Sequence, residues 1–285
     1  LFSTIHVLRI LKEKKINLVF TTGGFISAPT ILAAKLLKVP IVIHESNFIP
    51  GIVTKYFGSL CDNVLLGFQE TKKYLRNCKT IFTSTPLRKE FYMKNPLPEW
   101  VPKGKGPLIL IIGGSQGAKR INEIIYNSID FLVNKKFRIV HITGESQHLY
   151  SESAKSKTYV KKKFTNQVAA LMQNCDLVIS RSGSGTINEL MQTRKPSILI
   201  PYPNSKKNHQ EKNAMILTSI GGSILINENK LSEKLFQKTL SRIFNLNGKN
   251  HYQVLDLMKN NMKKYNYLES SNKIEKLINY FLNES

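Results

Sequence analysis

Short runs of β-branched residues alternate with amphipathic helical segments along most of the chain, and this alternation restricts the fold more than any other feature. The clearest unit is residues 177–189, where an apolar run ends at Ser180, a serine- and glycine-rich loop follows, and a helical pattern continues to Thr193. Each half of the chain also contains a strand-like run that ends in two glycines. Strands joined by helices run parallel, so the sequence predicts the α/β class with doubly wound parallel sheets.

The pattern stops at residues 95–107, which are rich in proline and glycine, and we expect a linker there. The prediction is a first domain over residues 1–94, a second over 108–265, and a C-terminal helix over 266–285 that packs back on the first domain. A chain of 285 residues is long enough for two cores.

Strands are expected at 17–21, 39–44, 63–66, 79–82, 108–112, 137–142, 177–180, 197–200 and 223–226. Helices are expected at 29–37, 51–60, 69–75, 118–131, 168–172 and 208–219, with 158–164 short and basic.

The chain is strongly basic, with 42 Lys and Arg against 19 Asp and Glu. Such an excess suits nucleic acid, an anionic membrane surface or a phosphorylated substrate, and solvated helix faces rich in lysine are the plain alternative. No interleaving of basic and aromatic residues and no helix-turn-helix pattern supports a nucleic-acid-binding module. No window approaches the roughly 20 apolar residues of a membrane span. Three widely separated cysteines predict a reduced, cytoplasmic protein.

The loop within residues 177–189 has the form of an anion site. A helix that opens at residues 183–186 leaves unpaired N–H groups and the positive end of its dipole at the loop, which favours a diphosphate. Glu189 follows about one turn later, where its carboxylate can accept hydrogen bonds from the hydroxyls of a ribose or sugar. The alternative is a capping arrangement, with Ser182 or Ser184 as N-cap and Glu189 in solvent.

Residues 113–118 form a second glycine-rich loop before a helix, with the Ser115 hydroxyl at the helix start. They match neither a P-loop nor a dinucleotide fingerprint, and a tight turn without a ligand is the alternative. Arg88 follows another strand, where it can clamp a phosphate or lie in solvent beside Glu90.

Two polar segments complete the candidates. Residues 44–47, His-Glu-Ser-Asn, follow a strand and suit sugar hydroxyls and proton transfer, although a structural histidine is the commoner case. Gln210 lies in a long polar loop, where it can bind a ligand or simply belong to a capped helix.

The order and identity of these blocks resemble the MurG family, which adds N-acetylglucosamine to the undecaprenyl-linked muramyl-pentapeptide of peptidoglycan synthesis. The resemblance runs from about residue 16 to residue 226. It is carried by Gly23-Gly24-Phe25-Ile26-Ser27, His44-Glu45-Ser46-Asn47, Pro86-Leu87-Arg88, residues 113–118 with Asn122, Arg181-Ser182-Gly183 with Thr186 and Glu189, and His209-Gln210 with Asn213.

The resemblance implies a GT-B fold, in which two Rossmann-like domains face each other across a cleft, and an inverting transfer from UDP-N-acetylglucosamine. It implies diphosphate contacts from Ser115 and Arg88, uracil contacts near Thr165, and N-acetylglucosamine contacts from Gln210 and, from the first domain, Asn47. Donor contacts to diphosphate, ribose and sugar are implied for Ser184, Gly185, Thr186, Ile187, Asn188 and Glu189. It also implies a peripheral protein on the cytoplasmic face of the bacterial plasma membrane, held there by the basic charge. The chain has no Asp-x-Asp pair, so we expect no metal and no other cofactor.

The chain departs from the family pattern in several places. The first glycine-rich motif, with the family's favoured general-base histidine, has no counterpart and would precede Leu1. The N-terminal domain is therefore expected to be truncated, the catalytic base stays unassigned with His44 and Glu45 as nearby candidates, and this chain is expected not to turn over. Thr85, Thr165 and Gly185 also stand where the family usually has other residues. Another GT-B enzyme of UDP-sugars, a glycolipid synthase or an epimerase, is the alternative enzyme class, and the sequence leaves the oligomeric state open.

Overall fold

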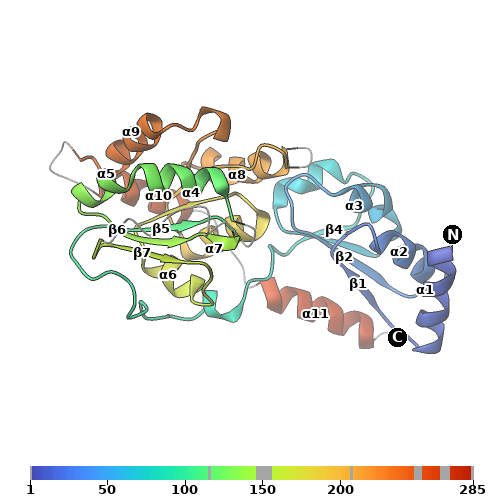
Figure 1. Ribbon diagram of the computed structural model, residues 1–285. Helices are drawn as coiled ribbons and strands as arrows, with labels where there is room; N and C mark the ends of the chain where they lie inside the picture. Colours follow the sequence, from blue (N-terminus) through green and yellow to red (C-terminus); the bar gives the residue numbers. More distant parts are fainter. Residues whose placement is uncertain are drawn as a thin grey trace. The chain divides into compact units, whose positions relative to one another are not determined.

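The computed structural model describes residues 2–114, 117–145, 156–205, 208–246, 252–263 and 270–283. The chain forms two compact units, Leu1–Leu87 with Tyr267–Ser285 and Arg88–Asn266 (Figure 1). The division falls before Arg88 and not within residues 95–107, because that segment packs on the second unit. Asn95 Nδ2 donates to Gln173 Oε1 at 3.0 Å, and Trp100 Nε1 donates to Gln167 Oε1 at 2.8 Å.

The first unit is built on a four-stranded parallel sheet. Its order is β1 (Val19–Thr21), β2 (Ile41–Glu45), β3 (Asn63–Leu66) and β4 (Thr80–Phe82). Every residue of β2 is buried, which explains why its first three residues, Ile41, Val42 and Ile43, are all apolar and do not alternate with polar residues.

Helices cover both faces of this sheet. On one face, residues such as Ile43 and Val64 pack against α1 (Phe2–Glu13), α2 (Ser27–Leu36) and α3 (Ile52–Phe57). On the other face, Val42 and Leu65 pack against α11 (Ser270–Asn283), which Figure 1 shows on the side of β1 and β2 away from α3. Ser270 Oγ of α11 donates to the carbonyl of Ser84 at 3.2 Å.

The second unit contains a six-stranded parallel sheet in the order β10-β9-β8-β5-β6-β7. These strands are β5 (Leu108–Ile112), β6 (Arg138–Ile142), β7 (Tyr159–Lys162), β8 (Leu177–Ser180), β9 (Ser197–Leu199) and β10 (Ser223–Leu225). The chain winds outward from β5 in one direction and from β8 in the other, so the strand order reverses between these two central neighbours. The prediction of two parallel-sheet α/β units is confirmed. The second sheet is doubly wound, as predicted, whereas the described strands of the first follow one another in a single direction.

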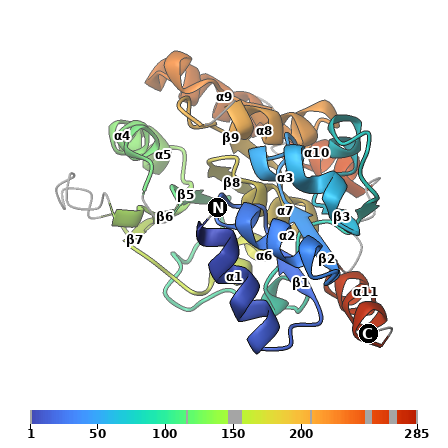
Figure 2. The same ribbon diagram turned by 90° about the vertical axis from the view of Figure 1, so that its right-hand side faces the viewer.

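Helices also cover both faces of the second sheet. One core joins Ile109, Ile111 and Ile179 to α4 (Lys119–Asn127), α5 (Ile129–Asn134), α9 (Glu233–Ile243) and α10 (Gln253–Lys263). Figures 1 and 2 show α4 and α6 (Val168–Asn174) on opposite sides of the sheet. The remaining helices are α7 (Ser184–Thr193) and α8 (His209–Ser219).

Three elements differ from the sequence expectations. Residues 69–75 form a 3₁₀ segment, η2 (Gln69–Tyr74), in place of an α-helix. The helix expected at 118–131 is two helices, α4 and α5, which are interrupted at Ser128. The basic segment near 158–164 is an edge strand, β7, whose residues are all half-buried. Short segments of this kind carry too little periodicity to separate 3₁₀, α and strand conformations.

Candidate functional site

A large pocket of the second unit lies where its strand order reverses. Ile112 at the end of β5 is in register with Ser180 at the end of β8, so the loops that follow leave the sheet side by side. Crevices of this kind, outside the carboxyl ends of parallel strands, are where open α/β sheets bind ligands. The pocket has a volume of about 870 Å³, within the range of small-molecule sites. It is lined by Gly113, Gly114, Gly117, Ala118, Lys119, Arg120, Glu123, Arg181, Gly183, Thr186, Tyr202, Gln210 and Glu228.

Two helix N-termini open into this pocket. The N-cap residues are Ala118 for α4 and Gly183 for α7, and neither of these two residues makes a side-chain cap hydrogen bond. The capping alternative from the sequence is therefore wrong for Ser182, whose hydroxyl donates to the carbonyl of Gln210 at 2.7 Å. The main-chain N–H groups and the positive dipole ends at these two helix starts make this end of the pocket favourable for an anion.

Glu189 lies one turn into α7 and faces Arg88. Arg88 Nη2 is 4.0 Å from Glu189 Oε1, and the two side chains are 52% and 21% exposed. Burial raises the pKa of the Glu189 carboxyl to about 7, and the Arg88 guanidinium acts in the opposite direction. Glu189 is therefore not in solvent. Arg88, expected from the first domain, belongs to the second unit, and its guanidinium also lies 5.5 Å from the ring of Phe91.

Hydrogen bonds join the loops after β8 and β9 to the start of α8. Gln210 Oε1 accepts from the main-chain N–H of Tyr202 at 2.9 Å, and Asn213 Nδ2 donates to the carbonyl of Ser182 at 3.3 Å. In the described part of the chain, Gln210 Nε2 has no hydrogen-bond partner. This amide, on the pocket lining, is available to donate to a ligand.

Arg181 and Glu228 form an ion pair on the wall of the pocket, and both side chains are largely buried. Arg181 Nη1 also donates to the carbonyls of Ile200 and Pro201, at 3.0 and 3.2 Å. Sequence reasoning placed Arg181 in a motif but gave it no role, although its position directly after β8 was a usable signal. Glu228 gave no signal, because it comes from a 3₁₀ turn, η6 (Glu228–Lys230), that only the tertiary structure brings to β8.

The other sequence-predicted residues of α7 divide into two groups. Thr186 lines the pocket, while Ser184 is half-buried and Gly185 exposed. Ile187 and Asn188 are fully buried, and Asn188 Nδ2 donates to the carbonyl of Ser184 at 2.7 Å. Their positions on α7 point these two side chains into the core.

Among the described residues of the second unit that are predicted donor contacts, Arg88, Glu189 and Thr165 are not among the residues that line the pocket. Thr165, after β7, is half-buried, and its hydroxyl accepts from the main-chain N–H of Gln167 at 3.1 Å. Ser115 lies outside the described residues.

In the first unit, residues 44–47 form a tightly bonded turn after β2. His44 is buried, its Nε2 lies 3.0 Å from the carbonyl of Ser84, and burial lowers its pKa. Glu45 is also buried and accepts from the main-chain N–H groups of Asn47 and Gly51 at 2.9 and 2.7 Å. The side chain of Asn47 donates to Glu45 as well, at 3.3 Å. This geometry fits a structural histidine and a carboxylate that orders the turn around Asn47.

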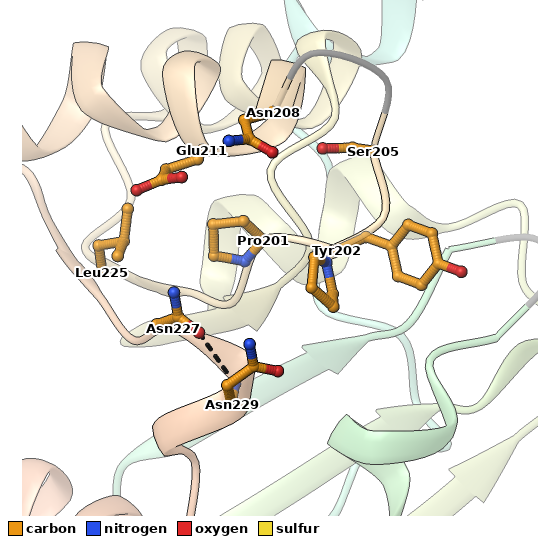
Figure 3. Close-up of a pocket in the computed structure, with 9 residues that line it drawn as sticks. Pro201, Tyr202, Ser205, Asn208, Glu211, Leu225, Asn227 and Asn229 are labelled. Atoms are coloured by element: carbon orange, nitrogen blue, oxygen red, sulfur yellow. Dashed lines mark hydrogen bonds between the residues drawn. The ribbon is translucent and has the colours of Figure 1, made fainter.

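A smaller pocket of about 150 Å³ adjoins the first and shares Tyr202 with it. Figure 3 shows Asn208 and Glu211 at the start of α8 on one side, and Asn227 and Asn229 on the other. The side chain of Asn227 accepts from the main-chain N–H of Asn229 at 2.9 Å, which fixes that wall.

Two properties of the described residues bear on the class of site. Within residues 2–114, 117–145, 156–205, 208–246, 252–263 and 270–283, no three His, Cys, Asp or Glu side chains are grouped so that they could hold a metal ion. None of the helices in these same ranges is both long and apolar enough to cross a membrane.

The chain matches two family descriptions. "Glycosyltransferase family 28 C-terminal domain" matches residues 108–279, and "Glycosyltransferase family 28 N-terminal domain" matches residues 1–66.

Curated relatives and a solved structure extend the match. A protein of Prochlorococcus marinus (strain MIT 9515) is 69% identical over all of this chain and 79% of its own length. Another, from strain NATL2A, is 43% identical over 98% of this chain and 78% of its own length. Both are named UDP-N-acetylglucosamine–N-acetylmuramyl-(pentapeptide) pyrophosphoryl-undecaprenol N-acetylglucosamine transferase. The crystal structure of Acinetobacter baumannii MurG superposes with a TM-score of 0.78 at 24% identity, covering 97% of this chain and 78% of that one.

Proposed function

The chain belongs to glycosyltransferase family 28, and within it to the MurG family, and from this premise we propose how its second unit holds a UDP-sugar. It is a hexosyltransferase that moves N-acetylglucosamine from UDP-N-acetylglucosamine to the undecaprenyl-pyrophosphoryl-linked muramyl-pentapeptide of peptidoglycan synthesis. Identity of 69% over the whole chain, to a relative with this name, is not matched by any sequence feature that favours a glycolipid synthase, an epimerase or a nucleic-acid-binding module.

We place the donor diphosphate in the 870 Å³ pocket, between the N-termini of α4 and α7. The convergence of two helix N-termini, whose N-cap residues make no side-chain cap hydrogen bond, is the observation that carries this placement. The carboxylate of Glu189 accepts the ribose hydroxyls, and the amide of Gln210 donates to the sugar. Arg88 exchanges its contact with Glu189 for the diphosphate when the donor binds.

The reaction is an inverting displacement at the anomeric carbon. A hydroxyl oxygen of the acceptor forms the new bond to that carbon, the bond to the β-phosphate oxygen breaks, and the hydroxyl proton passes to a base. UDP departs with the bonding electron pair. Fixed N–H dipoles of α7 and the Arg88 guanidinium stabilise the negative charge that develops on the leaving oxygen, and they need little reorganisation because the fold already orients them. The base is not assigned, because His44 and Glu45 are both committed to internal hydrogen bonds.

We propose that the leaving group is stabilised without a metal ion. Arg88 and the helix N-termini supply the positive potential that a divalent cation supplies in metal-dependent transferases, and the chain has no Asp-x-Asp pair.

We further propose that the first unit rests on the anionic cytoplasmic surface of the membrane that carries the acceptor. Phe25, Ile26 and Leu36 are 65%, 87% and 70% exposed at the loop before α2 and at the C-terminal end of that helix. Lysines 12, 14, 15, 35 and 38 accompany them on α1 and α2 and in the turns that follow. Exposed apolar side chains with basic neighbours are the composition of a peripheral docking face.

The direct test is a transfer assay with radiolabelled UDP-N-acetylglucosamine and the lipid-linked acceptor, on this chain and on a form that carries the family's first glycine-rich motif. The form that carries this motif is expected to transfer the sugar to the lipid-linked acceptor. A longer form that is inactive on the lipid-linked acceptor would contradict the assignment.

A further inference from the structure

A chain of buried side chains behind the large pocket connects the sheet to the pocket's glycine-rich wall. We propose that His141, acting through Asn122, is a positioning residue that holds the main chain of Gly114 and Gly117, in the loop after β5, in place on the pocket wall. The inference rests on the proposed function, because the loop concerned is the one to which the donor diphosphate is assigned.

The donor and the acceptor of each hydrogen bond in this series of side chains can be assigned. His141 lies on β6 and is fully buried, with its Nδ1 2.9 Å from the Tyr159 hydroxyl and its Nε2 2.9 Å from Asn122 Oδ1. Asn122 Nδ2 donates to the carbonyl of Thr143 at 3.1 Å, so Oδ1 is the acceptor that faces the imidazole ring. His141 Nε2 therefore carries the hydrogen, and Nδ1 accepts from Tyr159.

The imidazole is neutral under ordinary conditions. Burial lowers the pKa of His141 to about 3, and the positive charge of Lys161 acts in the same direction. In this neutral tautomer each of the three bonds has one donor and one acceptor, so the chain of bonds is complete from Tyr159 to Thr143.

The hydrogen bond from Asn122 fixes the position of Thr143, and the next residue, Gly144, lies against the pocket wall. Gly144 has a φ of +68°, and a Cβ placed on it would lie 2.4 Å from the nitrogen of Gly117 and 2.6 Å from the carbonyl oxygen of Gly114. The loop after β6 therefore touches the main chain of the loop after β5 directly, with no side chain between them. Gly114 and Gly117 line the pocket, so a displacement of Thr143 moves the pocket wall.

Asn122 adds a second connection. It lies in the first turns of α4, whose N-terminus opens into the same pocket, and its side chain is fully buried. The asparagine thus joins α4 to the loop after β6, and His141 fixes the orientation of the amide that does so. A polar group buried in this way costs free energy unless it is fully hydrogen-bonded, so packing alone would favour an apolar residue at position 141.

The test is the affinity of the full chain for UDP, measured by isothermal titration calorimetry, in three variants. H141L removes both ring hydrogen bonds and is expected to weaken UDP binding about tenfold. H141Q carries an amide N–H at the same number of bonds from Cβ as the imidazole Nε2, so it keeps the donor to Asn122 and is expected to stay within about threefold of the wild type. F137L is the structural control, because Phe137 is fully buried just before the opposite end of β6 and packs on Phe244.

The proposal requires that F137L lower the thermal midpoint as H141L does while the affinity for UDP stays unchanged. UDP binding by H141L that equals the wild type, or an equal loss of affinity in F137L, would overturn it. If H141L does not fold, H141N replaces it. Asparagine places its amide near the Nδ1 position, so it keeps only the hydrogen bond to the Tyr159 hydroxyl. Equal affinities of H141N and H141Q would then overturn the proposal, whereas a wild-type chain that binds no UDP would overturn the proposed function itself.

Discussion

The guanidinium of Arg88 lies 4.0 Å from the carboxylate of Glu189, so the group assigned to the diphosphate and the group assigned to the ribose contact each other before any donor is present. Burial holds the pKa of this carboxyl near 7, even with a cation beside it. Both residues belong to the second unit, so these two proposed donor contacts come from one folded domain.

The pH dependence of donor binding follows from Glu189. The raised pKa means that the carboxyl is mostly protonated below about pH 7 and mostly ionised above it. Since the ionised form accepts from two ribose hydroxyls, the affinity for UDP-N-acetylglucosamine is expected to rise as the pH increases through about 7. Calorimetric titrations across this range are expected to show the dependence in the wild type and its loss in E189Q. A dependence that persists in E189Q would assign it to another group.

Replacement of Arg88 tests the diphosphate clamp. R88A removes the cation that pairs with Glu189 and is expected to lower kcat/KM of an active, longer form about 100-fold, the scale of losing one charge-stabilising group. R88K keeps the charge but not the planar fork, so an intermediate loss is expected. R242A, an exposed arginine on α9, is the matched control. Equal rates for R88A and R242A would remove Arg88 from the mechanism.

Gly144 tests the contact between the loops after β5 and β6. G144A places a methyl group 2.4 Å from the Gly117 nitrogen, so the loop after β5 must move and UDP binding is expected to be lost. G221A is the control, because Gly221 has a similar φ of +70° and meets the Asn261 side chain at 2.8 Å, but it lies before β10, at the opposite edge of the sheet. Both variants are expected to lose about 1 kcal/mol of stability or more from the backbone conformation alone. Only G144A is expected to change the affinity for UDP.

The ion pair between Arg181 and Glu228, on the pocket wall, is expected to stabilise the folded second unit. R181M leaves the largely buried Glu228 carboxylate without its cation and is expected to destabilise the second unit by about 3 kcal/mol. The R181M/E228M double variant removes both charges and is expected to recover part of that loss. Urea denaturation of the wild type, both single variants and the double variant gives the coupling energy. A coupling energy near zero would mean that the two charges do not stabilise each other.

Membrane docking by the first unit is open to a sedimentation test. The wild type is expected to co-sediment with vesicles that contain phosphatidylglycerol and to dissociate as the salt concentration rises. I26S/L36S removes two exposed apolar side chains and is expected to weaken binding at low salt, whereas L257S, with a 61% exposed leucine on α10, is expected not to. Binding that is insensitive to both salt and I26S/L36S would exclude this face.

The sequence by itself determined the class of fold and identified the glycine-rich loops that follow the strands at 108–112 and 177–180. Strands such as Leu108–Ile112 and Leu177–Ser180 are buried on both faces and therefore appear as uninterrupted apolar runs, and the glycine-rich segments after them mark their carboxyl ends. The parallel order of the strands follows from this alternation, because helical crossovers require it. Glu189 and Gln210 were identified because helix starts at strand ends are local in sequence.

Only the tertiary structure decided which of these residues face a ligand and which serve the fold. Ile187 and Asn188 share a motif with Thr186, yet their directions on α7 bury them. Glu228 reaches Arg181 across 47 positions of sequence, and no local pattern records such a pair. His141 reaches Asn122 because β6 and α4 are adjacent in the folded unit. Burial and pairing depend on what the rest of the chain places nearby, and for that reason the raised pKa of Glu189 and the origin of Arg88 in the second unit could not be obtained from residue spacing.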